Sequence, residues 1–158
     1  MNMHQRPAER PTAHVDVDLR EDTLVVASFD KTKAGFWRMN DYLTLMDATV
    51  SDEALGAEVR MAARASKIGV ATPGRSDDSP ALQRLLRETG VKTFSSYMKG
   101  VRQLSLTFYS DRVRATPQLN KGARSGFVPI VEETTELSAE SSDAELGTAV
   151  RDALDRAR

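Results

Sequence analysis

Residues 51–67 read SDEALGAEVRMAARASK, and residues 142–158 read SDAELGTAVRDALDRAR. Both begin with Ser-Asp, a favoured helix start, and continue with Leu, Val and Ala at helical spacing. A glycine inside a helix costs about 1 kcal/mol relative to alanine, so a glycine at the same place in both segments indicates a close backbone approach to a sheet or another helix. At a fixed offset of 91 residues, seven of the 17 positions are identical: Ser51/Ser142, Asp52/Asp143, Leu55/Leu146, Gly56/Gly147, Val59/Val150, Arg60/Arg151 and Ala62/Ala153.

These segments predict two equivalent helices, at 51–66 and 142–156, that pack on one sheet through their Leu-Val-Ala faces. The sheet is predicted from β-branched or alternating segments, and the alternation in 101–119 favours an antiparallel hairpin. A shorter helix is expected at 80–89, between Ser79-Pro80 and Gly90. The fold class is therefore α+β with a mainly antiparallel sheet. Its expected strands lie near 23–29, 101–109, 111–119 and 127–131, with further candidates at 43–50 and 134–138.

Composition restricts the chemistry. The chain of 158 residues contains no cysteine and only two histidines, His4 and His14, in a polar segment at 1–14 that we expect to be a flexible tail. Residues 15–158 are then expected to form a single domain. Without thiols or paired histidines in that domain, no metal or other cofactor is expected. No apolar run spans a bilayer and no signal peptide is evident, which predicts a cytoplasmic protein without a membrane partner.

The net charge of −1 conceals a strong segregation of charge. Residues 39–59 hold five acids and residues 125–150 hold six, with no base in either stretch. Residues 84–124 hold nine bases against two acids. These segments either neutralise one another across neighbouring strands or give a dipolar surface that suits a charged partner.

Several of the same residues follow an order that resembles the immunity proteins of bacterial contact-dependent growth inhibition, the CdiI type. The likeness extends from about Thr23 to the end of the sequence. The residues that carry it are Leu55-Gly56, Val59-Arg60, Ala62, Ser66-Lys67, Gly69, Pro73, Thr116-Pro117, Gly126-Phe127 and the segment 142–147.

The resemblance implies a protein that is not an enzyme. Such proteins bind the C-terminal toxin domain of a CdiA-type effector, often a nuclease, and block it in the cytoplasm. We expect a one-to-one complex that occludes the toxin's active site, because an acidic surface can fill the positive groove that a nuclease needs. The resemblance carries over no binding residues. From charge alone, the candidate toxin-binding residues are Asp47, Glu132, Glu133, Glu136 and Glu140.

A second hypothesis is a small nucleic-acid-binding module. It would use the basic hairpin 101–119, with Phe94, Tyr97, Phe108 or Tyr109 stacking on bases. The sequence pI of about 6.1 argues against it, since such domains are usually basic. A carboxylate-based enzyme is a third class without positive support, because Asp52 and Glu53 are explained as first-turn helix acids and no residue is assigned as catalytic.

Overall fold

The computed structural model describes residues 9–74 and 79–158. It contains one eight-stranded sheet with the strand order β3-β2-β1-β5-β6-β7, in which β8 also pairs with β6 and β4 pairs in parallel with β2. The strands are β1 (Ala13–Arg20), β2 (Thr23–Thr32), β3 (Trp37–Asp47), β4 (Ile68–Val70), β5 (Arg102–Phe108), β6 (Arg112–Asn120), β7 (Phe127–Pro129) and β8 (Thr135–Ser138). The helices are α1 (Asp52–Ala65), α2 (Pro80–Thr89), α3 (Phe94–Met98) and α4 (Asp143–Arg156), with a 3-10 turn η1 (Val131–Glu133).

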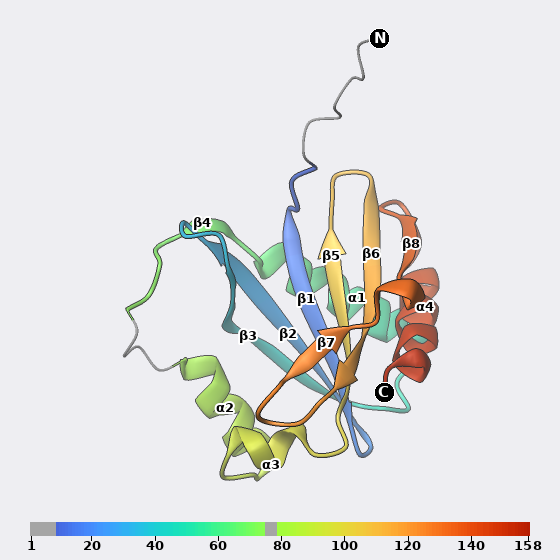
Figure 1. Cartoon of the computed structure of the whole chain (residues 1–158). Helices are drawn as coiled ribbons and strands as arrows, with labels where there is room; N and C mark the ends of the chain where they lie inside the picture. Colours follow the sequence, from blue (N-terminus) through green and yellow to red (C-terminus); the bar gives the residue numbers. More distant parts are fainter. Residues whose placement is uncertain (1–8, 75–78) are drawn as a thin grey trace.

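The sheet lies between two unequal layers of helix. Helices α1 and α4 pack side by side behind it, while α2 and α3 cover one corner of the front (Figure 1). The rear core is built from the buried Leu-Val-Ala faces of α1 and α4 and the inward residues of the strands. A smaller front core joins Leu85 and Tyr97 to Val25, Ala27 and Leu43 of the sheet. The α+β prediction, with both long helices on one sheet, is confirmed.

The two long helices meet at their glycines, as their shared sequence predicts. A Cβ placed on Gly56 would lie 1.8 Å from the carbonyl oxygen of Asp143, and one placed on Gly147 would lie 1.8 Å from that of Asp52. Each contact joins the fifth residue of one helix to the first residue of the other. Real Cβ atoms do not approach backbone this closely, so only glycine fits at either position.

Two arginines repeat the same reciprocity. Arg60 of α1 donates from Nε to Asp143 of α4 at 2.9 Å, and Arg151 of α4 donates from Nε to Asp52 of α1 at 2.6 Å. Each guanidinium also donates to two carbonyls just before the partner helix: Arg60 to Ala139 and Ser141, Arg151 to Ala48 and Val50. The identical Ser-Asp-x-x-Leu-Gly-x-x-Val-Arg pattern therefore encodes one interface used twice.

The connections of the strands repeat as well. Three strands, β1, β2 and β3, precede α1, and β5, β6 and β8 precede α4 in the same pairing order. The two halves join where β1 and β5 pair antiparallel, with Val15 opposite Leu106 and Val17 opposite Leu104. Outside the helices the two halves share no clear sequence pattern, so the repeat is one of topology.

Some predicted boundaries are wrong. The strand expected at 43–50 is β3, which begins earlier at Trp37 and ends at Asp47, because it pairs with β2 along most of its length. The strand expected at 127–131 ends at Pro129, since η1 begins at Val131. The remaining predicted strands and the helix at 80–89 are present, and β1, β4 and α3 were not predicted.

The first testable prediction concerns the glycine contacts. Gly147→Ala should lower the free energy of unfolding by roughly 2–4 kcal/mol, although alanine is the better helix former, because the new methyl group collides with the backbone of α1. Gly56→Ala should behave alike. Asp155→Ala, an exposed change on α4, is the matched control and should stay within about 0.5 kcal/mol of the parent. Urea denaturation measures all three, and a glycine variant as stable as the control would contradict the close approach.

Candidate functional site

The front of the sheet is polar at its centre. Along β1, Val15 and Val17 point into the rear core, so His14, Asp16 and Asp18 point to the front. Strand β5 alternates in the same way. Its front residues are Gln103, Ser105 and Thr107, which pair with the β1 acids and His14.

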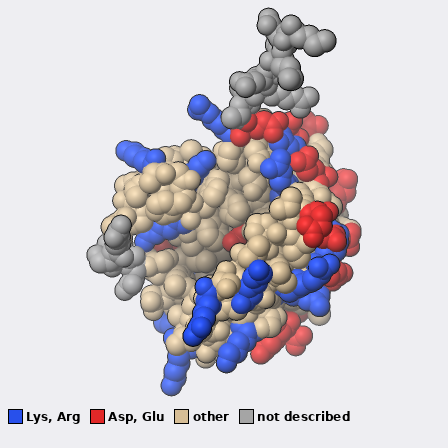
Figure 2. Space-filling view, in the orientation of Figure 1, with Lys and Arg blue, Asp and Glu red and all other residues tan. Residues whose placement is uncertain are grey.

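Between α2 and β7 this front is hollow. A cavity of about 330 Å³ has Asp16 and Asp18 among its lining residues, together with Phe29, Phe94 and Phe127. A second, more open cavity of about 470 Å³ is lined by His14 and extends to Val131, the first residue of η1. We call these two cavities together the hollow face. Figure 2 shows the depression, with an acidic side chain at its base.

Asp18 is the most unusual group of the hollow face. Only 8% of it is exposed, and its carboxylate accepts hydrogen bonds from the Tyr97 hydroxyl at 2.6 Å and from Gln103 at 2.9 Å. Burial, reinforced by the charge of Asp16, raises the pKa of Asp18 to about 7, although both hydrogen bonds favour the ionised form. Burial likewise raises the pKa of Tyr97, with the neighbouring Asp18 charge as a second cause.

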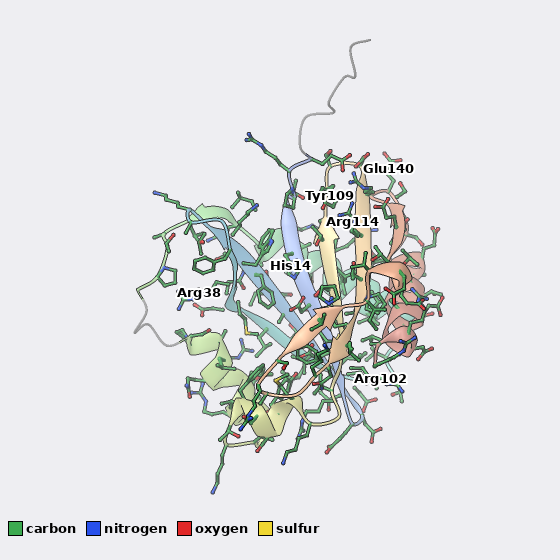
Figure 3. The ribbon with its side chains drawn as sticks, viewed as in Figure 1. His14, Arg38, Arg102, Tyr109, Arg114 and Glu140 are labelled. Carbon is green, nitrogen blue, oxygen red and sulfur yellow. The ribbon has the colours of Figure 1, made fainter. Side chains whose placement is uncertain are left out.

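Asp16 belongs to a second polar cluster in the hollow face. Its carboxylate lies 2.8 Å from Nε2 of His14 and accepts from Ser105 at 2.9 Å. The imidazole of His14 stacks on Trp37, with ring centroids 5.2 Å apart, and packs edge-on against Phe29. Figure 3 labels His14 in the middle of this face.

Placing His14 in a flexible tail is therefore wrong. Strand β1 begins at Ala13, inside the predicted tail of residues 1–14, because the backbone from Ala13 onward pairs with both β2 and β5. Most of the predicted tail, including His4, lies outside the described residues. Within residues 9–74 and 79–158, no three His, Asp or Glu side chains are arranged to hold a metal ion, and no helix has the length and apolarity to span a membrane.

The five predicted toxin-binding acids do not form one cluster. Asp47 ends β3 at one edge of the sheet, while the four glutamates lie in η1, in β8 and in the turn before α4 at the other edge. Glu136 is paired with Arg112 and Arg114, and Glu133 with Arg156. Glu132 and Glu140 are exposed, and neither forms an ion pair within the described residues. Asp47 accepts hydrogen bonds from the hydroxyl and the backbone N–H of Thr49. Both bonds lower the pKa of Asp47, and the bond from the hydroxyl has the larger effect.

Two of the three bases in the predicted basic hairpin, Arg112 and Arg114, are already paired with acids. Arg112 pairs with Glu9, Asp111 and Glu136, and Arg114 pairs with Glu136. Both guanidinium groups also lie over the ring of Tyr109. The proposed stacking residues Tyr97 and Phe108 are buried, while Phe94 remains 41% exposed. The hairpin therefore does not present the continuous basic surface that the second hypothesis expects, because neighbouring acids neutralise Arg112 and Arg114 while Arg102 forms no ion pair within the described residues.

The residues of the hollow face carried a signal that the sequence analysis missed. Residues 14–19 read HVDVDL, a strict alternation of polar and apolar side chains that is typical of a strand with one buried face. The alternation identifies β1. It does not reveal that part of the polar face is also buried, because that burial depends on α3, which places Tyr97 over Asp18.

The titration of Asp18 yields a second testable prediction. The folded protein holds this proton up to about pH 7, whereas an unperturbed aspartic acid releases it near pH 3.8. The stability that Asp18 contributes is therefore fully present below pH 3.8 and is lost as the pH rises from there through 7. The slope contributed by one such group approaches 1.4 kcal/mol per pH unit. Urea denaturation at pH 5, 6, 7 and 8 should show a flatter profile for Asp18→Asn than for the parent. Subtracting the two profiles isolates the contribution of Asp18, and parallel profiles would contradict the raised pKa.

Comparison with solved structures identifies the fold. A protein of unknown function from Neisseria meningitidis superposes with a TM-score of 0.78 at 17% sequence identity, covering 98% of this chain and 99% of the other. A chain of the CdiA-CT/CdiI toxin and immunity complex from Yersinia pseudotuberculosis superposes with a TM-score of 0.72 at 19% identity, covering 92% of this chain and 97% of the other. At these identities the likeness concerns the fold alone.

Sequence comparison identifies the family. No curated protein matches the chain significantly. Residues 76–157, however, match the family model described as CdiI, CDI immunity protein. That match includes the segment from α2 to α4, with Gly147 and the Arg151 that binds α1. Because it covers more than half of the 158 residues, the chain belongs to the CDI immunity protein family.

Proposed function

We propose that this protein binds the C-terminal toxin domain of a CdiA-type effector and neutralises it in the cytoplasm. Membership of the CDI immunity protein family supports the partner, and the solved toxin and immunity complex supports the mode of action, by binding. The protein acts without cofactor or chemistry of its own. It forms a one-to-one complex that occludes an active site directed at nucleic acid.

The observation that carries the docking proposal is the hollow face. Its more enclosed cavity joins apolar walls to Asp16 and Asp18, two carboxyl groups withdrawn from solvent. A cationic side chain that enters this cavity meets the acids at its end group and the aromatic walls along its stem. Toxins that act on nucleic acid present such cations in the groove that binds phosphate, so occupation of the hollow face also occludes that groove.

The predicted acids contribute at the rim. The hollow face ends against Val131 of η1, which is 71% exposed, and Glu132 follows it directly in the chain. Glu132 and Glu140 have no ion-pair partner within residues 9–74 and 79–158, so both keep their charge for a positive toxin surface. Rim charges mainly accelerate association. Glu133 and Glu136 contribute less because their arginine partners compensate them, and Asp47 contributes least because it lies at the opposite edge of the sheet.

The third testable prediction separates the two acids inside the hollow face, called the floor, from the two unpaired glutamates Glu132 and Glu140, called the rim. The double variant Asp16→Asn/Asp18→Asn preserves side-chain shape but removes both charges, and should weaken toxin binding by about 30-fold or more, mainly through faster dissociation. The variant Glu132→Gln/Glu140→Gln should lower the association rate a few-fold and reduce its dependence on salt. Surface plasmon resonance with the toxin domain encoded beside this gene measures both rates.

A matched control removes two charges from the rear helices. Glu53→Gln/Asp155→Asn alters exposed residues of α1 and α4, on the far side of the sheet, and should bind and protect like the parent. Equal affinity of the parent, floor and rim variants would contradict the docking surface. Failure of the parent protein to bind the toxin domain or to protect cells that produce it would contradict the function itself.

A further inference from the structure

A basic surface lies at the end of the sheet remote from His14. A cavity of about 590 Å³ opens where the α3–β5 connection, the loop after β6 and the last residue of the chain meet. Lys99, Arg102 and Arg158 are among its lining residues, and no Asp or Glu is. Lys121 and Arg124 are exposed on the loop that supplies Gly122 and Ala123 to the same cavity. We call these five cations the basic end.

The cations of the basic end are not paired with acidic side chains. All five are exposed, and none forms an ion pair within the described residues. Elsewhere on the molecule, six arginines pair with carboxylates: Arg60, Arg84, Arg112, Arg114, Arg151 and Arg156. Figure 2 shows basic side chains across the lower part of this view, with some acidic side chains beside them, and Figure 3 labels Arg102 there. Basic side chains around a cavity that no Asp or Glu side chain lines favour a polyanionic partner.

The backbone of the basic end leaves room for that partner. Gly100 and Gly122 line the cavity with φ angles of +72° and +85°, and a Cβ built on either would meet nothing within 4 Å. The surface over both residues is therefore open, and phosphate groups can approach the main chain between the arginine and lysine side chains.

An aromatic side chain favours nucleic acid over an acidic peptide. Helix α3 supplies Ser95 and Met98 to the cavity, and the same helix carries Phe94, which lines the neighbouring 330 Å³ cavity and is 41% exposed. The ring of Phe94 is held by stacking on buried Tyr97, with centroids 5.9 Å apart. Cations that follow a phosphate backbone beside a fixed, exposed ring are the elements of single-strand recognition.

We propose that the basic end binds single-stranded nucleic acid through its phosphates, with Phe94 stacking on a base. The cations of this site lie outside the hollow face, although Phe94 also lines the 330 Å³ cavity there, and the proposal does not depend on toxin binding. The site shares Arg102 with the start of the predicted basic hairpin, but the hairpin arginines at 112 and 114 lie at the opposite end of β5 and β6 and are already paired.

The fourth testable prediction uses a fluorescein-labelled 20-nucleotide oligouridylate and fluorescence anisotropy. The variant Arg102→Gln/Lys121→Gln/Arg124→Gln should weaken binding tenfold or more at low salt. Single strands give a slope of about −0.7 in log K against log salt for each phosphate neutralised, so losing three contacts should flatten the slope by about 2. Phe94→Ala should weaken binding several-fold without changing the slope, because it removes stacking and no charge.

The matched control carries the same charge change at the other end of the sheet. Lys33→Gln/Arg64→Gln/Lys67→Gln replaces three exposed bases around the end of β2 and α1, and should bind within twofold of the parent. Equal losses in the two triple variants, or no binding by the parent at low salt, would overturn the proposal. A labelled 20-residue polyglutamate is the second probe. If it binds as tightly as the oligonucleotide, with the same dependence on Arg102, Lys121 and Arg124, the assignment to nucleic acid is wrong.

Discussion

The rest of the structure depends on the reciprocal contact between α1 and α4. At two points the backbone of one helix lies against the first residue of the other, and each point requires the missing side chain of a glycine. An arginine beside each point binds the aspartate and preceding carbonyls of the opposite helix. Asp52 accepts hydrogen bonds from the Thr148 hydroxyl and from Arg151, and these bonds lower its pKa, with the Thr148 bond having the larger effect. Electrostatic attraction and close packing therefore act at the same place. Overpacking here is costly because backbone, unlike a side chain, has no alternative rotamer to adopt.

This contact determines which face of the sheet remains for function. Two helices packed against each other cover the rear of the central strands, where Val15, Val17, Leu104 and Leu106 are fully buried. The front is covered only at the corner occupied by α2 and α3. The exposed part of an antiparallel sheet is free to carry polar side chains, and here those side chains form the floor of a cavity. The burial of Asp18 follows from this half-covered arrangement, because α3 shields it while β1 holds it at the centre of the sheet.

Some charged side chains of the surface are neutralised in ion pairs, and others are not. Many arginines of the segment 84–124 and of the helices are used in ion pairs, which neutralise the acidic segments that lie beside them. The hollow face keeps two acids, Asp16 and Asp18, in a cavity that Arg38 also lines, and Glu132 follows its exposed residue Val131. The cations of the basic end lie outside these cavities. Phe94 is the residue that both proposed surfaces use.

The sequence by itself determined the elements and the principal contact. Helical spacing, Ser-Asp caps and the repeated Leu-Gly identify α1 and α4, and the glycines predict the close approach because their cost in a helix has no local compensation. Alternation identifies the central hairpin, although boundaries that depend on long-range pairing, such as the start of β3 at Trp37, do not follow from local pattern. Only the tertiary structure decided the sites. Acids that look equivalent along the chain differ once folded: Glu136 is neutralised by Arg114, Glu132 stays free, and Asp18 is withdrawn from water by a tyrosine 79 residues away. Burial and pairing set the electrostatics of a carboxylate, and both arise from residues distant in sequence.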